Sequence, residues 1–522
     1  MAGLVLVASG CSTTGGSEPS QDAKRFYDGY SRNQQGDTAS GPSGGSGTTS
    51  SQQGSAGTAR TGPPAPTQPS GPAEPDPLDG NTFSDAGTSG FIDPRVDPQS
   101  TFAADVDTGS YRVARALLAD GHLPPPESVR VEEWVNSFDS GFPSPGRDDL
   151  ELRTDQSLSP SEPDRTRLVR IGLQGRDVDR EDWQPVALTM VVDTSGSMDS
   201  RERLGLVKAS LALLVQHLRP SDSMAIVTYE TNAKPLLEPT PVRDAEVILT
   251  AIDSLQAGGS TNLEAGLLLG YDQARAAHKA GATNVVLLAS DGVANVGVTD
   301  GGQLATAIRD NGRRGIHLVT VGYGMGSYND HLMEQLADRG DGFYAYVDTF
   351  EEARRLFVDD LRTTLTPIAR DAKLQVDFDP RTVSAYRLVG YDNRALADED
   401  FDDPAVDAGE VGAGHRVTAL YEVVPTPEAE VGDSLGTVRV RWRSVEDDDQ
   451  REDSQSLTLA SPEPPVGTLG VAAAVADLAR LIKDREEVSA GSLQERVDAL
   501  VEQEARGATE LASLLTDVLS AG

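Results

Sequence analysis

Apolar runs and amphipathic stretches alternate from residue 187 to residue 365. The short runs rich in Val, Ile and Leu predict strands, because a strand buried on both faces is apolar throughout. The expected strands are 187–193, 224–229, 233–237, 284–290, 316–321 and 343–347. The stretches between them repeat apolar residues at helical spacing. The expected helices are 201–218, 244–255, 262–279, 302–313, 329–338 and 350–365. This alternation predicts an α/β fold, a doubly wound and mostly parallel sheet with one antiparallel edge strand at 233–237.

After Thr366 a strict alternation of apolar and polar residues replaces this pattern. Loops rich in Pro, Gly and Asp separate the expected strands, which predicts an antiparallel β-sandwich. Those strands are 373–378, 385–391, 417–424 and 437–442. Residues 150–153 and 166–173 show the same alternation ahead of the α/β segment. We expect 166–173 to lie in one sandwich with the later strands, so that the α/β domain is an insertion. The alternative is two separate β units, one on each side.

Both ends of the chain differ from this middle part. Residues 12–96 are rich in Gly, Ser, Thr and Pro and poor in aliphatic residues, which predicts a disordered tether. Two short helices are expected at 113–118 and 129–138, and two longer ones at 466–483 and 492–519. The predicted segments are a leader at 1–11, the tether at 12–96, a helical and strand region at 97–185, the α/β domain at 186–365, a β-sandwich domain at 366–465 and C-terminal helices at 466–522.

The net charge, the cysteine content and one missing motif exclude several classes of function. The chain has 45 basic and 82 acidic residues and a formal net charge of −37. Such a surface repels phosphate backbones and anionic headgroups, so we expect no nucleic-acid partner. Cys11 is the single cysteine, which excludes an intrachain disulfide. No Gly-rich phosphate loop with a lysine follows any expected strand, which excludes a P-loop nucleotide hydrolase.

Small oxygen-bearing residues follow two of the buried strands. Strand 187–193 ends in Asp193-x-Ser195-x-Ser197, and strand 284–290 ends on Asp291. Thr261 follows a Gly-Gly-Ser turn before a helix. Ligands of open α/β sheets bind outside the carboxyl ends of strands, and carboxylate and hydroxyl oxygens suit a small hard cation. Asp199, just beyond the first turn, is expected to cap the following helix.

These three parts together resemble the metal-ion-dependent adhesion site of the von Willebrand factor type A domain. The resemblance implies that Asp193, Ser195, Ser197, Thr261 and Asp291 hold one divalent ion, Mg²⁺ or Mn²⁺. It implies protein binding rather than catalysis, with a Glu or Asp carboxylate of an unidentified partner protein completing the coordination. Residues 100–465 resemble a group of bacterial lipoproteins that carry a conserved N-terminal region and an uncharacterised C-terminal domain around the type A module.

The first residues resemble the end of a bacterial lipoprotein signal. Val7-Ala-Ser-Gly-Cys11 places a cysteine where such signals are cut and lipidated. Ala8 stands where leucine is usual, and the apolar stretch lacks a basic flank. The resemblance implies a lipid on Cys11 and an extracytoplasmic location, with the membrane contacted through the anchor alone.

Two other classes of function stay open at this stage. A metal-assisted hydrolase would use the same ion on a bound water, but no histidine lies near the three loops in sequence. A structural envelope protein would use the ion only to make the loops rigid.

Overall fold

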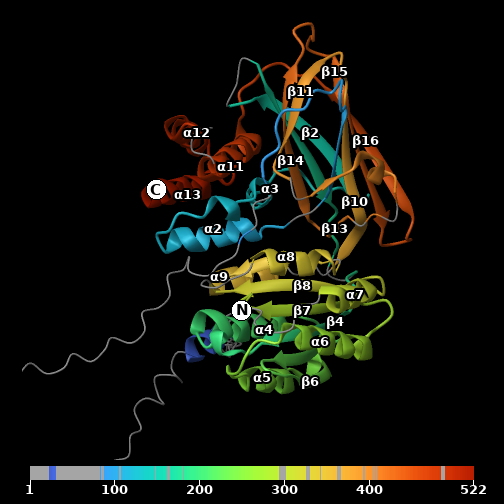
Figure 1. Ribbon diagram of the computed structural model, residues 1–522, viewed down its shortest axis with the longest axis vertical. Coiled ribbons are helices and arrows are strands. Elements are labelled where there is room, and N and C mark those ends of the chain that lie inside the picture. Colours follow the sequence, from blue (N-terminus) through green and yellow to red (C-terminus); the bar gives the residue numbers. More distant parts are fainter. Residues whose placement is uncertain are drawn as a thin grey trace, which may run out of the picture.

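The computed structural model describes the greater part of the folded chain. The residues described are 23–30, 83, and 87–522 apart from 105–106, 147, 161–164, 180–181, 293–300, 325–329, 341, 361–365, 392–393, 404–405, 407 and 484–487. Two bodies are visible in Figure 1, an α/β domain and a β-sandwich with helices packed on its side. In the described part of the chain, no helix is both long and apolar enough to cross a bilayer.

The α/β domain is built on one six-stranded sheet, which confirms the predicted fold. Across the sheet the strands are β6 (Ala233–Pro241), β5 (Ser223–Tyr229), β4 (Val186–Asp193), β7 (Thr283–Ser290), β8 (Ile316–Tyr323) and β9 (Tyr344–Val347). All neighbours are parallel except β5 and β6, so the expected antiparallel edge strand is present. The central strands β4 and β7 are buried over their whole length, which explains their uninterrupted apolar runs.

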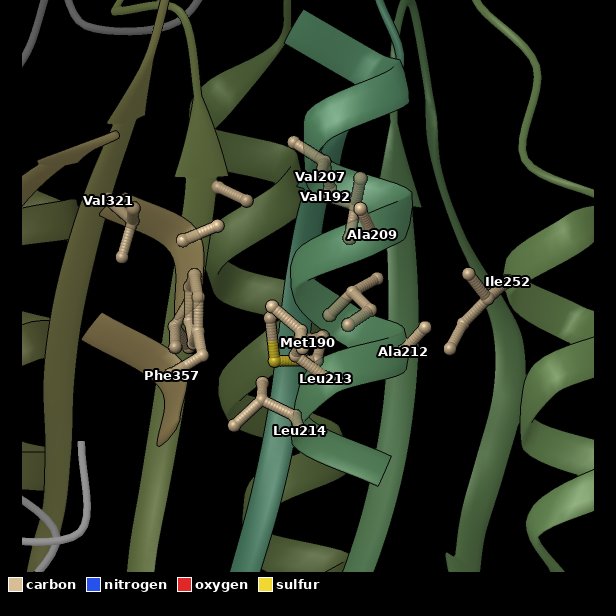
Figure 2. Close-up of a cluster of buried hydrophobic side chains, with 14 of the residues drawn as sticks. Met190, Val192, Val207, Ala209, Ala212, Leu213, Leu214, Ile252, Val321 and Phe357 are labelled. Carbon is tan, nitrogen blue, oxygen red and sulfur yellow. The ribbon is translucent and has the colours of Figure 1, made fainter. Parts of the chain in front are cut away.

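Helices cover both faces of this sheet. One face is packed by α4 (Leu206–His217), α5 (Ala245–Asp253) and α9 (Phe350–Arg354), the other by α6 (Leu263–Ala277), α7 (Gly301–Gly312) and α8 (Asp330–Asp338). Figure 2 shows Leu213 and Leu214 of α4 beside Met190 of β4, in the first of these cores. Because successive strand residues face opposite sides, Val191 belongs to the other core.

The β-sandwich consists of two antiparallel sheets. One sheet has the order β12 (Ala395–Leu396), β1 (Gln99–Ala103), β10 (Pro367–Phe378), β15 (Ser434–Ser444) and β16 (Gln450–Thr458), and β13 (Gly409–Gly412) also pairs with β10. The second has the order β11 (Val383–Val389), β14 (Arg416–Pro425), β3 (Arg167–Gly175) and β2 (Leu150–Leu158). Strand β3 pairs with β14 along its length, so 166–173 does lie in one sandwich with the later strands. The alternative of two separate β units is wrong.

Five helices form an apolar cluster on one side of the sandwich. They are α2 (Gly109–Ala119), α3 (Val131–Asn136), α11 (Gly467–Lys483), α12 (Ala490–Glu502) and α13 (Ala508–Ala521). Trp134 is fully buried at its centre. The single helix expected at 492–519 is wrong, because α12 ends at Glu502 and α13 begins only after Gly507. Glu504, just beyond α12, has a φ of +54°, and a residue in the left-handed region commonly ends a right-handed helix.

A short helix at residues 23–30 lies inside the stretch expected to be a disordered tether, and there that expectation is wrong. Ala23 is fully buried, and Phe26, Tyr27 and Tyr30 pack against the α4 side of the α/β core. Aromatic residues among the glycines and serines supply the apolar surface that this docking buries.

Candidate functional site

The first loop of the site begins where β4 ends. Asp193 is fully buried, and its Oδ1 accepts a hydrogen bond of 2.9 Å from the backbone N–H of Ser195. Its Oδ2 accepts one of 2.8 Å from Ser290 Oγ and one of 3.2 Å from Tyr229 Oη. Three strands therefore fix one carboxylate, because Tyr229 ends β5 and Ser290 ends β7.

Two serine hydroxyls lie next to each other in the same loop. Ser195 is buried and Ser197 is exposed, and their Oγ atoms are 3.1 Å apart. A short 3₁₀ turn at Gly196–Met198 brings alternate side chains to one side of the loop. The loop thus presents one covered and one solvent-facing hydroxyl.

The second loop is held against the first by backbone hydrogen bonds. Gly196 N–H donates to the carbonyl of Gly259 at 3.1 Å, and Gly258 N–H donates to that of Thr194 at 2.8 Å. Thr261 follows in this second loop and is buried. Gly259 has a φ of +81°, and a Cβ there would lie 2.3 Å from Glu230 Oε2, so this approach of the loops requires glycine.

The third loop begins at Asp291, at the end of β7, the strand beside β4. Asp291 is fully buried. Burial and, to a smaller extent, the nearby charge of Asp291 together raise the pKa of Asp193 to about 6. The negative charges of two carboxylates buried near each other would be stabilised by a cation bound to their oxygens.

Arginine is the cation that this structure shows at the site. Arg203 Nη1 lies 3.1 Å from Asp291 Oδ2 and donates to the carbonyl oxygen of Ser197 at 2.6 Å. Arg203, Ser290 and Tyr229 were not among the site residues predicted from the sequence. Ser290 and Tyr229 could have been found, because each ends a buried strand next to the one that carries Asp193.

The structure therefore brings the predicted residues together at one edge of the sheet. In the described part of the chain no group of three or more His, Cys, Asp and Glu side chains could hold a metal ion. A metal here would depend on hydroxyl oxygens as well as the two carboxylates, and this set suits a small hard cation.

The predicted capping role of Asp199 is wrong, because Ser200 occupies the cap position before Arg201. The Oδ1 atom of Asp199 instead accepts a hydrogen bond of 2.7 Å from Tyr30 Oη. Cys11 lies outside the described residues.

Three protein families match successive parts of the chain. Residues 77–170 match von Willebrand factor, residues 187–359 match the von Willebrand factor type A domain, and residues 363–512 match the C-terminal region of the uncharacterised protein YfbK. The last match extends beyond the β-sandwich through α11 and α12 into α13. It joins the two C-terminal segments that the sequence analysis had separated at residue 465.

Several known proteins are similar to parts of this chain. YfbK of Escherichia coli is 39% identical over 341 residues, which are 62% of this chain and 58% of that protein. An uncharacterised Synechocystis protein is 30% identical over 206 residues, which are 40% of this chain and 48% of its own length. A solved structure, von Willebrand factor type A from Catenulispora acidiphila, is 17% identical with a TM-score of 0.41 and covers 74% of this chain and 88% of its own.

The family matches and the fold give the same order of domains along the chain. The chain spans little more than half of the length of the Escherichia coli relative. The α/β domain coincides with the type A match, and the match at 363–512 contains the strands that follow it, including β14, the partner of β3. The type A domain is a protein-interaction module that is often metal-dependent. The chain thus combines a von Willebrand factor type A domain with a YfbK-type C-terminal domain.

Proposed function

We propose that this protein is a protein-binding module whose type A domain holds Mg²⁺ or Mn²⁺ and uses it to engage an Asp or Glu carboxylate of a partner protein. The oxygens of Asp193, Ser195, Ser197, Thr261 and Asp291 would hold the ion. The observation that carries the proposal is the burial of two carboxylates beside hydroxyl-bearing loops at one edge of the sheet. A cation bound between the two carboxylates would stabilise this arrangement.

The chemistry of the ion explains the choice of ligand. Mg²⁺ prefers octahedral oxygen coordination and readily keeps water in some positions. Because the other oxygens from this chain are neutral hydroxyls, the ion would stay a Lewis acid and could accept a carboxylate of the partner in place of a water. Ser197 is exposed, so one side of the loop is open to an incoming side chain.

We propose binding rather than catalysis at this site. A hydrolase would need a general base within hydrogen-bond reach of a metal-bound water. Within the described residues, Asp193 accepts hydrogen bonds from Ser195, Tyr229 and Ser290, none of which is such a base at neutral pH. The two carboxylates are themselves proposed to hold the ion.

We further propose that the protein is anchored on the extracytoplasmic side of a membrane through a lipid on Cys11. The support is the lipoprotein-like sequence before Cys11 and the tether-like composition after it. An acidic surface, with a net charge of −37, argues against direct contact with anionic headgroups and with nucleic acid.

A capture experiment tests the binding role. The wild type and Ser195→Ala are used as bait on an envelope extract, with Mg²⁺, with EDTA, and with Mg²⁺ restored. We expect a partner that the wild type retains only with Mg²⁺ and that Ser195→Ala loses without a change in thermal stability. Ser254→Ala, on an exposed position of the same domain, is the matched control. Retention unaffected by EDTA and by Ser195→Ala would contradict the proposal.

A further inference from the structure

Arg203 contacts two of the residues proposed to hold the ion. Its guanidinium bridges the carbonyl oxygen of Ser197 and the carboxylate of Asp291, at 2.6 and 3.1 Å. The Arg203 side chain is 16% exposed and that of Asp291 is fully buried. A charged hydrogen bond so well shielded from solvent is stronger than a surface pair.

Two features of the backbone, a π-helical turn and a glycine, place Arg203 at the site. Residues Arg201–Gly205 form a π-helical turn before α4, a distortion that is frequent at functional sites. Gly324, just after β8, lies under the arginine stem with a φ of +74°. A Cβ there would lie 2.6 Å from Arg203 Cγ and 2.7 Å from its Nε, so the stem occupies space that only glycine leaves.

A second arginine in the same turn has a different environment. Arg201 donates from Nε to Glu202 at 3.0 Å, and its guanidinium lies 4.9 Å from the centre of the Tyr27 ring. Its side chain is 45% exposed. Arg201 therefore belongs to the surface where the helix at 23–30 docks, whereas Arg203 belongs to the site.

We propose that Arg203 is the resident counter-ion of the site and competes with the divalent ion for Asp291. The inference rests on the proposed function, because it concerns the same oxygens. While no ion is bound, the guanidinium neutralises Asp291 and stabilises the loops. A divalent ion that uses Asp291 must displace the guanidinium and then lies near its positive charge. Both effects weaken ion binding, since repulsion between like charges is large where solvent is excluded.

Titration with Mn²⁺ alone, followed by electron paramagnetic resonance of the free ion, tests the proposal on the full chain. We expect Arg203→Gln to bind Mn²⁺ at least about tenfold more tightly than the wild type, since repulsion and competition both disappear. Arg203→Lys keeps the charge and should stay within about threefold of the wild type. Arg201→Gln, the matched control, should bind like the wild type. A wild-type affinity equal to or above that of Arg203→Gln would overturn the inference.

Thermal unfolding in EDTA gives a second readout that needs no ion. Loss of the counter-ion leaves Asp291 buried beside Asp193, so Arg203→Gln should unfold roughly 2–4 °C below the wild type and Arg201→Gln should not. An unchanged midpoint for Arg203→Gln would overturn the counter-ion role. If neither the wild type nor Arg203→Gln binds Mn²⁺, the proposed metal site fails. If both bind Mn²⁺ and Arg203→Gln binds it no more tightly than the wild type, the inference fails while the proposed metal site stands.

Discussion

Val169 of β3 lies directly opposite Tyr421 of β14, although the whole type A domain separates them in sequence. Both side chains are buried in the sandwich core. The chain leaves the sandwich at Gly175 and returns near Ile368, and a Cβ on Gly175 would lie only 3.1 Å from Ile368 Cδ1. The ends of the insertion are therefore close together, as they are where one domain tolerates another within it.

Excision of the insertion should leave a folded sandwich. If residues 182–365 are replaced by a short Gly/Ser linker, the strand pairs of both sheets are retained. The product loses contacts such as the ion pair between Arg394 and Glu334, so we expect lower stability but a single cooperative transition in urea, followed by circular dichroism. A cut at 182–340 leaves β9 without its sheet and should aggregate. A product of the first cut without a cooperative transition would show that the sandwich depends on the insertion.

A buried ion pair ties the sandwich to the C-terminal helices and gives a pH dependence. Glu422 of β14 contacts Arg480 of α11 at 3.3 Å and Arg387 of β11 at 2.5 Å. Burial raises the pKa of Glu422, but the charges of Arg480 and Arg387 outweigh it, and the pKa falls to about 2. A lowered pKa in the folded state contributes stability above the unfolded-state pKa of about 4.3, and this is lost as the pH falls toward 2.

The expected difference between the wild type and Glu422→Gln is about 3 kcal/mol of unfolding free energy at neutral pH. It should shrink steadily between about pH 4.3 and pH 2. Urea denaturation at several pH values measures it. Glu428→Gln, at an exposed position of the following loop, should show little difference at any pH. A difference between wild type and Glu422→Gln that does not change with pH would contradict the assignment.

Periodicity and motif spacing predicted the sheet, its antiparallel edge and the loops of the site. The reason is that β4 and β7 are buried on both faces and end directly in the residues concerned. The contact between Arg203 and Asp291 could not be predicted, because it depends on a π-helical turn and on a glycine over 100 residues away. The break between α12 and α13 was also missed, since the apolar repeat continues on both sides of it. Docking of residues 23–30 depends on tertiary contacts that local composition does not reveal.

The helix at residues 23–30 should stabilise the loop beside the site. Tyr27 lies under the Arg201 guanidinium, and Tyr30 donates to Asp199. We expect Tyr27→Ala to lower the local stability of this docking by about 1–3 kcal/mol and Tyr30→Phe by about 1 kcal/mol. Hydrogen exchange at residues 23–30 measures both. Val247→Ala, on an exposed position of α5, should change nothing there. Equal exchange in the wild type and Tyr27→Ala would show that the docking contributes no stability.

Lipidation of Cys11 should decide where the protein is found. Burial of acyl chains in a bilayer stabilises the anchored state by about 0.8 kcal/mol for each CH₂ group. We expect the wild type to sediment with membranes and to incorporate a labelled fatty acid, whereas Cys11→Ser should be released into the soluble fraction. Washing with high salt serves as a control, because it removes proteins held by charge alone. Recovery of an unlabelled wild type from the cytosol would refute the anchor.

Asp193→Asn should separate stability from metal binding. Asp193 and Asp291 are both fully buried, and one arginine at 3.1 Å from Asp291 is the cation in contact with the pair. An amide at position 193 still accepts the hydrogen bond from the N–H of Ser195 and removes one buried charge. The hydroxyls of Ser290 and Tyr229, which donate to Oδ2 in the wild type, can turn and accept from the amide NH₂. We therefore expect the thermal midpoint in EDTA to rise by a few degrees, for a gain on the order of 1 kcal/mol in unfolding free energy.

The affinity of the same variant for Mg²⁺, measured by calorimetry, should fall at least about a hundredfold, since a carboxylate ligand is lost. Asp253→Asn, on an exposed position of α5, should alter neither quantity. Equal Mg²⁺ affinity in Asp193→Asn and the wild type would show that this loop does not hold the ion.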